Sequence, residues 1–232
     1  MEKSNHIIKI LAENRDFFSR IVDVEFSDKN VFVFDFSENN KALFEIDLDD
    51  TNVLNNYVFK TLEKEKKEVG VGGYFEDRLI YKRSKHFDND GEPRSIHLGI
   101  DIWLKAGEPI YSPLPGVVHS FKNNQRFGDY GPTLILEHLI EGETFYTLYG
   151  HLSLESVQNK TKGTQIRRGD IIAEIGDSNI NGGWPPHIHF QVITDMLGNE
   201  GDFPGVAPPS AKEYFHKLCI DPNLILKVNK LK

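Results

Sequence analysis

The chain has 232 residues, of which 39% are hydrophobic and 27% are charged, proportions typical of a globular protein. Its formal net charge of −8 argues against a nucleic-acid partner, because phosphate binding depends on Lys and Arg, and it gives no support for binding an anionic membrane. The single cysteine, Cys219, excludes a disulfide within the chain and fits a reducing compartment.

The N-terminal sequence lacks the continuous apolar core of a signal peptide. Charged residues such as Lys9, Glu13 and Asp16 interrupt its apolar positions. Nothing elsewhere approaches the roughly 20 apolar residues that a membrane-spanning helix requires. We therefore expect a cytoplasmic protein without membrane contact, exported only if the given sequence has been trimmed.

The pattern of residues 1–70 predicts a small α+β block. Apolar residues at helical spacing predict a helix over 6–21. Alternating apolar residues then predict three strands, at 22–26, 30–36 and 42–48, with a turn at Asn39-Asn40 between the last two. A second helix is expected over 54–68, capped by Asp50 or Thr51 and ended by the glycines that follow.

The rest of the chain reads as a loop, a strand-rich core and a tail. Residues 71–95 are rich in glycine and charge, which predicts a long loop. Residues 96–200 show strands separated by Pro-Gly, Gly-Asp and Gly-Gly turns, which favours an antiparallel core, and 163–176 resembles a tight hairpin. Residues 201–232 should hold a short helix from Ser210 and a tail that packs back on the core.

Two short patterns indicate a metal site. They are His97-Leu98-Gly99-Ile100-Asp101 and His187-Ile188-His189. A strand presents residues i, i+2 and i+4 on one face, so each pattern can direct its polar side chains to the same side. If the two strands lie together, two imidazoles and a carboxylate converge, with a third imidazole close by. Two His and one carboxylate with an open position form the ligand set of a catalytic zinc.

The surrounding sequence resembles the lysostaphin/LytM-type zinc endopeptidases. The motifs of that family are H-x-x-x-D, a His in a Y-x-H-L context, and H-x-H, and all three occur here in the same order between residues 96 and 193. The resemblance implies a mainly β fold, with an antiparallel two-sheet lysostaphin/LytM-like core containing a groove. The N-terminal block would be a small α+β extension of that core.

The resemblance also implies a division of roles. His97, Asp101 and His189 would bind one zinc ion, and His151 and His187 would be the catalytic pair that does not bind the metal. The sequence has no H-E-x-x-H helix to supply a glutamate base, and a histidine can take that role because its ordinary pKa of about 6.5 lies near neutral pH. We expect His151 to be the base and His187 the stabiliser, although the two roles can be exchanged.

For other residues in the chain, the evidence for a functional role is weaker. Structural or solvent-facing positions are expected for the remaining histidines, which are His6, His86, His119, His138 and His216. Three tyrosines are candidate oxyanion stabilisers, with packing on sheet faces as the alternative: Tyr111, Tyr146 and Tyr149. The 181–186 loop, with its Pro-Pro pair, predicts a rigid turn that also walls the substrate cleft through Trp184.

Three functions remain open from the sequence. The first is a zinc endopeptidase acting on peptidoglycan or a peptide derived from it. The second is a zinc amidohydrolase acting on a small peptide-like metabolite, which a closed pocket would favour. The third is a catalytically silent scaffold, which the complete ligand set disfavours. Partners other than a substrate would be further enzymes of a pathway. The N-terminal block would either cover a sheet edge or plug the cleft through the GVGGYFEDR segment.

Overall fold

The structure is a computed structural model of the chain and describes residues 2–83 and 92–231. Its α-helices are α1 (Glu2–Glu13), α2 (Thr51–Glu65), α3 (Glu155–Gln158), α4 (Lys212–Leu218) and α5 (Asn223–Leu226). Short 3-10 helices lie at η1 (Arg15–Phe17), η2 (Lys41–Glu45), η3 (Leu79–Arg83) and η5 (Pro209–Ala211). The strands are β1 (Val31–Phe34), β2 (Val69–Gly72), β3 (Ile96–His97), β4 (Ile100–Trp103), β5 (Pro109–Tyr111), β6 (Gly116–Asn124), β7 (Gly131–Ile140), β8 (Glu143–Gly150), β9 (Gln165–Ile166), β10 (Ile171–Glu174), β11 (His187–Ile193), β12 (Val206–Ala207) and β13 (Cys219–Ile220).

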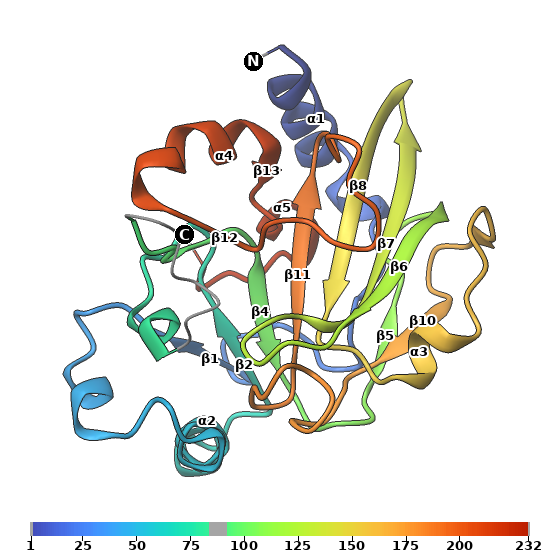
Figure 1. Cartoon of the computed structure of the whole chain (residues 1–232). Coiled ribbons are helices and arrows are strands. Elements are labelled where there is room, and N and C mark those ends of the chain that lie inside the picture. The colour runs from blue at the N-terminus through green and yellow to red at the C-terminus, as the bar shows by residue number, and fades with distance from the viewer. Residues whose placement is uncertain (1, 84–91, 232) are drawn as a thin grey trace.

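One large sheet organises the molecule (Figure 1). It has nine strands in the order β1-β2-β4-β11-β8-β7-β6-β9, with β13 also paired to β11. Two further pairs, β5 with β10 and β3 with β12, form separate two-stranded sheets. The β1–β2 pair is parallel, whereas the pairs from β2 to β9 are antiparallel. The mainly β class is therefore confirmed, but the expected two-sheet arrangement is not.

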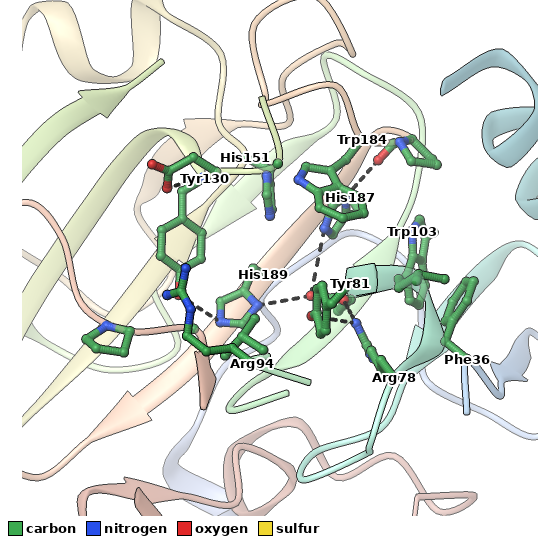
Figure 2. A pocket seen from close by; sticks show the side chains of 18 of the residues that line it. Phe36, Arg78, Tyr81, Arg94, Trp103, Tyr130, His151, Trp184, His187 and His189 are labelled. Atoms are coloured by element: carbon green, nitrogen blue, oxygen red, sulfur yellow. Dashed lines mark hydrogen bonds and ion pairs between the residues drawn. The ribbon is translucent and has the colours of Figure 1, made fainter. Parts of the chain in front are cut away.

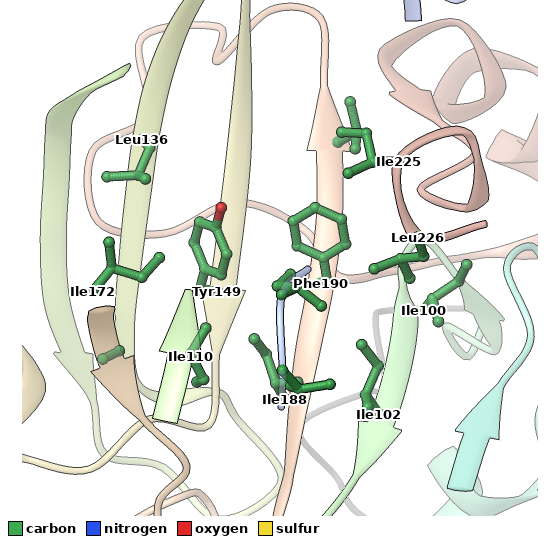
Figure 3. Close-up of a cluster of buried hydrophobic side chains, with 14 of the residues drawn as sticks. Ile100, Ile102, Ile110, Leu136, Tyr149, Ile172, Ile188, Phe190, Ile225 and Leu226 are labelled. Carbon is green, nitrogen blue, oxygen red and sulfur yellow. The ribbon is translucent and has the colours of Figure 1, made fainter. Parts of the chain in front are cut away.

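Alternating side chains divide the central strands between two faces. Ile100 and Ile102 of β4, together with Ile188 and Phe190 of β11, are fully buried on one face, which β5, β10 and α5 cover (Figure 3). The residues between them on β4 and β11 point to the opposite face, where the polar motifs lie. Burial of the apolar set thus fixes the direction of the polar set.

The N-terminal part of the chain continues the same sheet. Val69 and Val71 of β2 join the main apolar core, and Gly70 and Gly72 alternate with them on the other face. A Cβ atom at Gly72 would lie 2.6 Å from the Trp103 ring, so only glycine leaves room for that side chain. Residues 71–72, expected in a loop, therefore belong to a strand, while His86 lies outside the described residues.

Two of the three strands predicted near the N-terminus are absent from the described structure. Only 30–36 forms a strand, as β1. Segment 22–26 is irregular: Val22 is buried in the core, but among the described residues the segment pairs with no strand. Segment 42–48 begins instead with the 3-10 helix η2, whose first N–H groups are capped when the Asn40 side chain accepts from Ala42. The Asn39-Asn40 turn consequently joins no hairpin.

The predicted hairpin at 163–176 is also wrong. The segment does turn, since the N–H of Asp170 donates to the carbonyl of Arg167 (3.1 Å). Its two halves then diverge: β9 pairs with β6 at the edge of the large sheet, and β10 pairs with β5. Each half reaches an open edge of another strand, and Ile172 and Ala173 enter the core.

The predicted helices occur with shifted bounds, because α1 ends at Glu13 rather than near residue 21 and α2 ends at Glu65, followed by Lys66 in a left-handed conformation, before the glycines. The Asp50 side chain caps α2 by accepting from Asn52 and Val53, and α1 occupies the first part of the expected N-terminal helix. A helical segment begins at Pro209 and continues as α4, close to the expected start at Ser210. None of the helices in the described ranges is long and apolar enough to cross a bilayer.

His138 on β7 is a buried structural histidine. It is 1% exposed, its Nδ1 donates to the carbonyl of Pro115 (2.8 Å), and its Nε2 lies 2.7 Å from the Thr147 hydroxyl. Burial lowers the pKa of His138 to about 4, which means that the folded protein resists protonating this ring. Its neutral form therefore stabilises the fold.

The buried His138 predicts a loss of stability in mild acid. The unfolded chain takes up a proton near pH 6.5 and the folded chain only near pH 4, so this contribution is complete above pH 6.5 and declines as the pH falls toward 4. We expect the free energy of unfolding, measured by urea titration, to fall by roughly 2 to 3 kcal/mol more between pH 7 and 4.5 in the parent than in His138→Gln. The exposed His6→Gln variant should behave like the parent, and equal pH slopes in parent and His138→Gln would contradict the prediction.

Candidate metal centre

The two histidine motifs meet on the polar face of the large sheet. In the antiparallel pair β4–β11, Asp101 lies opposite His189 and Trp103 lies opposite His187. His97 does not share a strand with Asp101, as the spacing suggested, because the chain leaves β3 at His97 and enters β4 only at Ile100. Gly99 in this connection packs against His189, whose ring atoms would lie 2.7 Å from any Cβ there. The chain bend still directs His97 to the same point.

Three atoms of these residues form a small triangle. His97 Nε2 is 3.0 Å from His189 Nδ1, and Asp101 Oδ1 is 3.2 Å from the first nitrogen and 3.1 Å from the second. All three side chains are at least 96% buried, with exposed fractions of 0%, 3% and 3%. Ligands about 2.0–2.1 Å from a tetrahedral zinc are separated by about 3.3 Å, so the triangle has nearly the size that zinc requires.

Neighbouring groups decide which ring nitrogens carry hydrogen. His97 Nδ1 lies 2.9 Å from the carbonyl of Gly73, which can only accept, so this nitrogen donates. Gln191 donates through its amide nitrogen to the carbonyl of Pro204 (3.2 Å), which turns its amide oxygen toward His189 Nε2 at 2.9 Å. His189 Nε2 therefore donates as well. The nitrogens that face each other both present lone pairs.

This arrangement calls for a cation. Two imidazole lone pairs and a carboxylate oxygen converge within 3.2 Å, and no hydrogen lies among them when the rings are neutral. Neutral imidazole and carboxylate are zinc ligands, and an outer partner on the second nitrogen of a ligating histidine is the usual support of such a site. Among the described residues, one group of His, Cys, Asp or Glu side chains has donor atoms close enough together to hold a metal ion. It consists of His97, Asp101 and His189. The residues fit zinc.

Burial and charge keep His97 and Asp101 in their metal-binding forms. Burial, and then the nearby Arg78 cation, lower the pKa of His97 to about 3, so its ring is neutral. Burial alone would raise the pKa of Asp101, but the positive charge of Arg78 opposes this effect, and the pKa lies well below its ordinary value. The carboxylate is therefore ionised although it is buried.

His151 and His187 lie beside the triangle without joining it. Their ring centres are 4.1 Å apart, and His187 Nε2 is 3.8 Å from Asp101 Oδ1 (Figure 2). His151 Nδ1 donates to the carbonyl of Asn181 (2.8 Å), and His187 Nδ1 donates to that of Pro185 (2.7 Å). Both rings thus present Nε2 to the cavity side. Burial is the main cause that lowers the pKa of each ring.

The backbone at His151 is strained. Its φ of 63° lies in the left-handed region, which residues other than glycine seldom adopt. The surrounding chain holds this conformation, because the His151 N–H donates to the Tyr130 carbonyl (2.8 Å) and its carbonyl accepts from Gly176 (2.9 Å). Strain of this kind costs about 1–3 kcal/mol and is concentrated at functional sites. It turns the imidazole toward His187.

Arg78 is a central residue that the sequence reasoning missed. It is 1% exposed, its Nε donates to Glu76 Oε2 (2.7 Å), and one terminal nitrogen donates to Asp101 Oδ2. The second oxygen of Asp101 is thereby occupied, which leaves Oδ1 for the metal. Burial disfavours the guanidinium cation, but Tyr81 and Asp101 hold its pKa above the ordinary value. A charged residue inside the GVGGYFEDR segment was the available signal.

The tyrosines around the site are not the expected ones. Tyr111, Tyr146 and Tyr149 do not line the cavity that contains His151, His187 and His189. Tyr81 and Tyr130 do, and the Tyr130 hydroxyl lies 3.5 Å from His189 Nε2. Four other histidines also lie outside this cavity: His6, His119, His138 and His216.

The 181–186 loop forms the expected turn and places Trp184 at the cavity. The Asn181 side chain accepts from the Trp184 N–H (3.0 Å) and donates to the Trp184 carbonyl (3.0 Å), so it closes the turn from within. Trp184 is 5% exposed and lines the cavity. The same turn presents the carbonyls of Asn181 and Pro185 to the two catalytic candidates.

The GVGGYFEDR segment contributes support rather than a metal ligand in the described structure. The Gly73 carbonyl orients His97, and Arg78 binds Asp101. The first residues of the segment belong to strand β2, which pairs with β4 through Gly70–Trp103, Val71–Ile102 and Gly72–Asp101. This pairing covers the β4 edge, and no atom of the segment belongs to the converging donor group.

Comparison with known proteins shows which family the sequence around this site is similar to. Residues 95–200 match the model of Peptidase family M23. The peptidoglycan DD-endopeptidase ShyA of Vibrio cholerae serotype O1 is 33% identical over 97 residues, which are 42% of this chain and 20% of that protein. The chain thus spans about a fifth of the length of this curated relative.

Solved structures of peptidases have low overall similarity to this chain. A zinc-containing peptidase from Vibrio cholerae is 30% identical, with a TM-score of 0.33 over 42% of this chain and 27% of the other. The catalytic domain of lysostaphin from Staphylococcus simulans is 22% identical, with a TM-score of 0.35 over 52% of this chain and 80% of the other. The match to the Peptidase family M23 model over residues 95–200 confirms the resemblance to lysostaphin/LytM-type peptidases.

Proposed function

We propose that this protein is a zinc metallopeptidase that hydrolyses peptide bonds in peptidoglycan or in peptides derived from it. The observation that carries the proposal is the convergence of His97 Nε2, His189 Nδ1 and Asp101 Oδ1, whose lone pairs require a cation. The family match over residues 95–200 and the name of the curated relative supply the reaction and the substrate class. One zinc ion is proposed, because one such donor group is found in the described ranges.

The proposed chemistry assigns separate work to the metal ligands and to the other two histidines. Zinc, when bound, supplies a Lewis acid that lowers the pKa of water to about 7 and polarises a scissile carbonyl. His151 keeps its proton at Nδ1 through the Asn181 carbonyl, so Nε2 can accept a proton from the attacking water. His187, held in the same tautomer by Pro185, would orient the water or stabilise the developing charge.

A second candidate substrate is a small peptide-like amide. Phe36, Leu54 and Val58, which come from the N-terminal part of the chain, line the same cavity as the metal triad. They wall one side of a space of about 290 Å³, which favours a short ligand more than an open groove would. The complete donor triad continues to disfavour the silent-scaffold alternative.

We further propose that residues 96–200 form the lysostaphin/LytM-like peptidase core, with 1–70 as an N-terminal block, 71–95 as a connecting segment and 201–232 as the tail. The role of β2 in the large sheet makes the first two parts structurally dependent on the core. Association with other enzymes of a pathway and a cytoplasmic location remain predictions from the sequence.

The division between ligands and catalysts predicts two classes of variant. His97→Ala, Asp101→Ala and His189→Ala should each lose zinc and activity, because two ligands cannot hold the ion as three do. His151→Ala and His187→Ala should retain near-stoichiometric zinc and lose at least 100-fold in hydrolysis, a typical loss for removal of a general base. The measurements are metal content by atomic emission and cleavage of muropeptides and small amides in parallel. Equal zinc loss in all five variants would contradict the division.

Arg78 predicts a graded effect on zinc affinity. Arg78→Met frees Asp101 Oδ2 and removes the group that fixes the carboxylate, so zinc affinity should fall by roughly 10- to 100-fold in a chelator competition. Arg78→Lys keeps the charge without the paired donors, and its affinity should lie between the two. The matched control is Arg15→Met, which changes an exposed arginine distant in sequence from the motifs. Unchanged zinc affinity in Arg78→Met would show that Asp101 is positioned by β4 alone.

A further inference from the structure

The cavity around the metal triad has two chemically different ends. One end, here called the apolar end, is lined by Phe36, Leu54, Val58, Ile80 and Trp103. The other end is lined by Arg94, Asp129 and Asp202. Figure 2 shows Phe36 and Trp103 on one side of His187 and His189, with Tyr130 and Arg94 on the other side. A substrate bound across the triad would therefore meet different surfaces on its two sides.

The apolar end is built largely from outside the M23 segment. Phe36 follows β1, and Leu54 and Val58 lie four residues apart on α2, so that they share one face of this helix. All of these positions precede residue 95, where the family match begins. The substrate preference of the curated relative consequently carries no information about this side of the cavity.

The wall is held firmly in place. The Phe36 ring centre is 5.3 Å from that of Trp103 and 5.7 Å from that of Phe34. Helix α2 is fixed to the catalytic side because the Thr51 hydroxyl donates to the carbonyl of Gly183 (2.9 Å), in the turn that carries Trp184. Leu54 and Val58 are 1% and 0% exposed, so each contributes only a small part of its surface to the cavity and is otherwise packed. The pocket wall is thus preformed, which lowers the cost of ligand binding.

None of the described residues that line the apolar end is charged, so among them this end offers no partner for a charged side chain. The nearest ion is Arg78, which is already bound by Glu76 and Asp101. Its remaining terminal nitrogen, Nη2, has no accessible surface, and it packs against the Cα position of Gly72. A carboxylate or ammonium group placed there would lose its hydration without compensation.

We propose that the apolar end binds an uncharged, apolar side chain directly next to the scissile amide. The substrates would then be peptides or amides with an aliphatic residue at that position, and acidic or basic residues there would be rejected. This inference rests on the proposed zinc peptidase function and specifies its substrate class. It assigns to Leu54 and Val58 a role in specificity.

Simple zinc-binding probes test the proposal without knowledge of the natural substrate. The zinc-loaded full chain is titrated calorimetrically with acetohydroxamate, with 4-methylpentanohydroxamate, and with the monohydroxamate of glutaric acid. The aliphatic probe should bind roughly tenfold more tightly than acetohydroxamate or better, because its extra carbon atoms enter the apolar end. The acidic probe should bind no more tightly than acetohydroxamate.

Variants of one helix face supply matched controls. Leu54→Ala and Val58→Ala remove wall residues, whereas Leu62→Ala truncates a residue of the same apolar cluster that does not line the cavity. The preference for the aliphatic probe should fall about fivefold in Leu54→Ala or Val58→Ala and stay unchanged in Leu62→Ala, with acetohydroxamate affinity constant throughout.

The outcomes distinguish a failure of the apolar specificity from a failure of the proposed zinc peptidase site. Equal binding of the aliphatic probe and acetohydroxamate by the parent, or equal changes in Leu54→Ala and Leu62→Ala, would overturn the apolar specificity while leaving the zinc site intact. If the parent binds zinc but no hydroxamate, or binds no zinc at all, the proposed peptidase site is itself overturned and the apolar specificity with it. Zinc content and thermal unfolding, measured on every variant, identify any that fail to fold.

Discussion

The pairing register of β4 with β11 is the constraint on which the site depends. It sets Asp101 opposite His189 and Trp103 opposite His187, while Ile102 and Phe190 on the other face enter the core. Because strand side chains alternate, a slip of one residue would turn the polar set into the apolar core and the apolar set toward the cavity. The hydrophobic effect, acting on residues that take no part in chemistry, therefore selects the one register in which the metal triad converges.

Backbone carbonyls supply the second level of order. Those of Gly73, Asn181 and Pro185 each accept a hydrogen bond from an Nδ1 atom, so His97, His151 and His187 all present Nε2. His189 is the exception, because Gln191 binds its Nε2 and leaves Nδ1 for the metal. The backbone carbonyls of these turns and the side-chain amide of Gln191 thus determine which ring nitrogen of each histidine is available. A substitution in these turns could alter the chemistry of a histidine without touching it.

The sequence predicted the metal-binding and catalytic residues better than the residues and strands that hold them in place. The five residues expected to act together do lie together, since motif spacing on strands is a local property and their order in the chain matched a family. Arg78 was missed because its partner Asp101 is 23 residues away, and only the packing of β2 against β4 joins them.

The same limit explains the strands wrongly expected at 22–26 and 42–48. Alternation shows that a segment can be extended, but a strand also needs a partner edge, which no local pattern reveals. Conversely, β2 was missed because its glycines weaken the strand signal while they make room for Trp103 and Arg78.

The N-terminal part of the chain is consequently a component of the site. It provides the carbonyl that orients His97, the guanidinium that holds Asp101, and the wall at the apolar end.

The buried ionic cluster of Glu76, Arg78 and Asp101 has two carboxylates and one guanidinium, which leaves it with a single negative charge. Removing the guanidinium would leave two anions in a site from which water is largely excluded, and a buried anion without its partner is strongly destabilising. A divalent cation reverses the sign of the cluster to a single positive charge, and an anion that develops on a substrate would then be attracted to it. Arg78 therefore links the stability of the N-terminal packing to the electrostatic character of the metal centre.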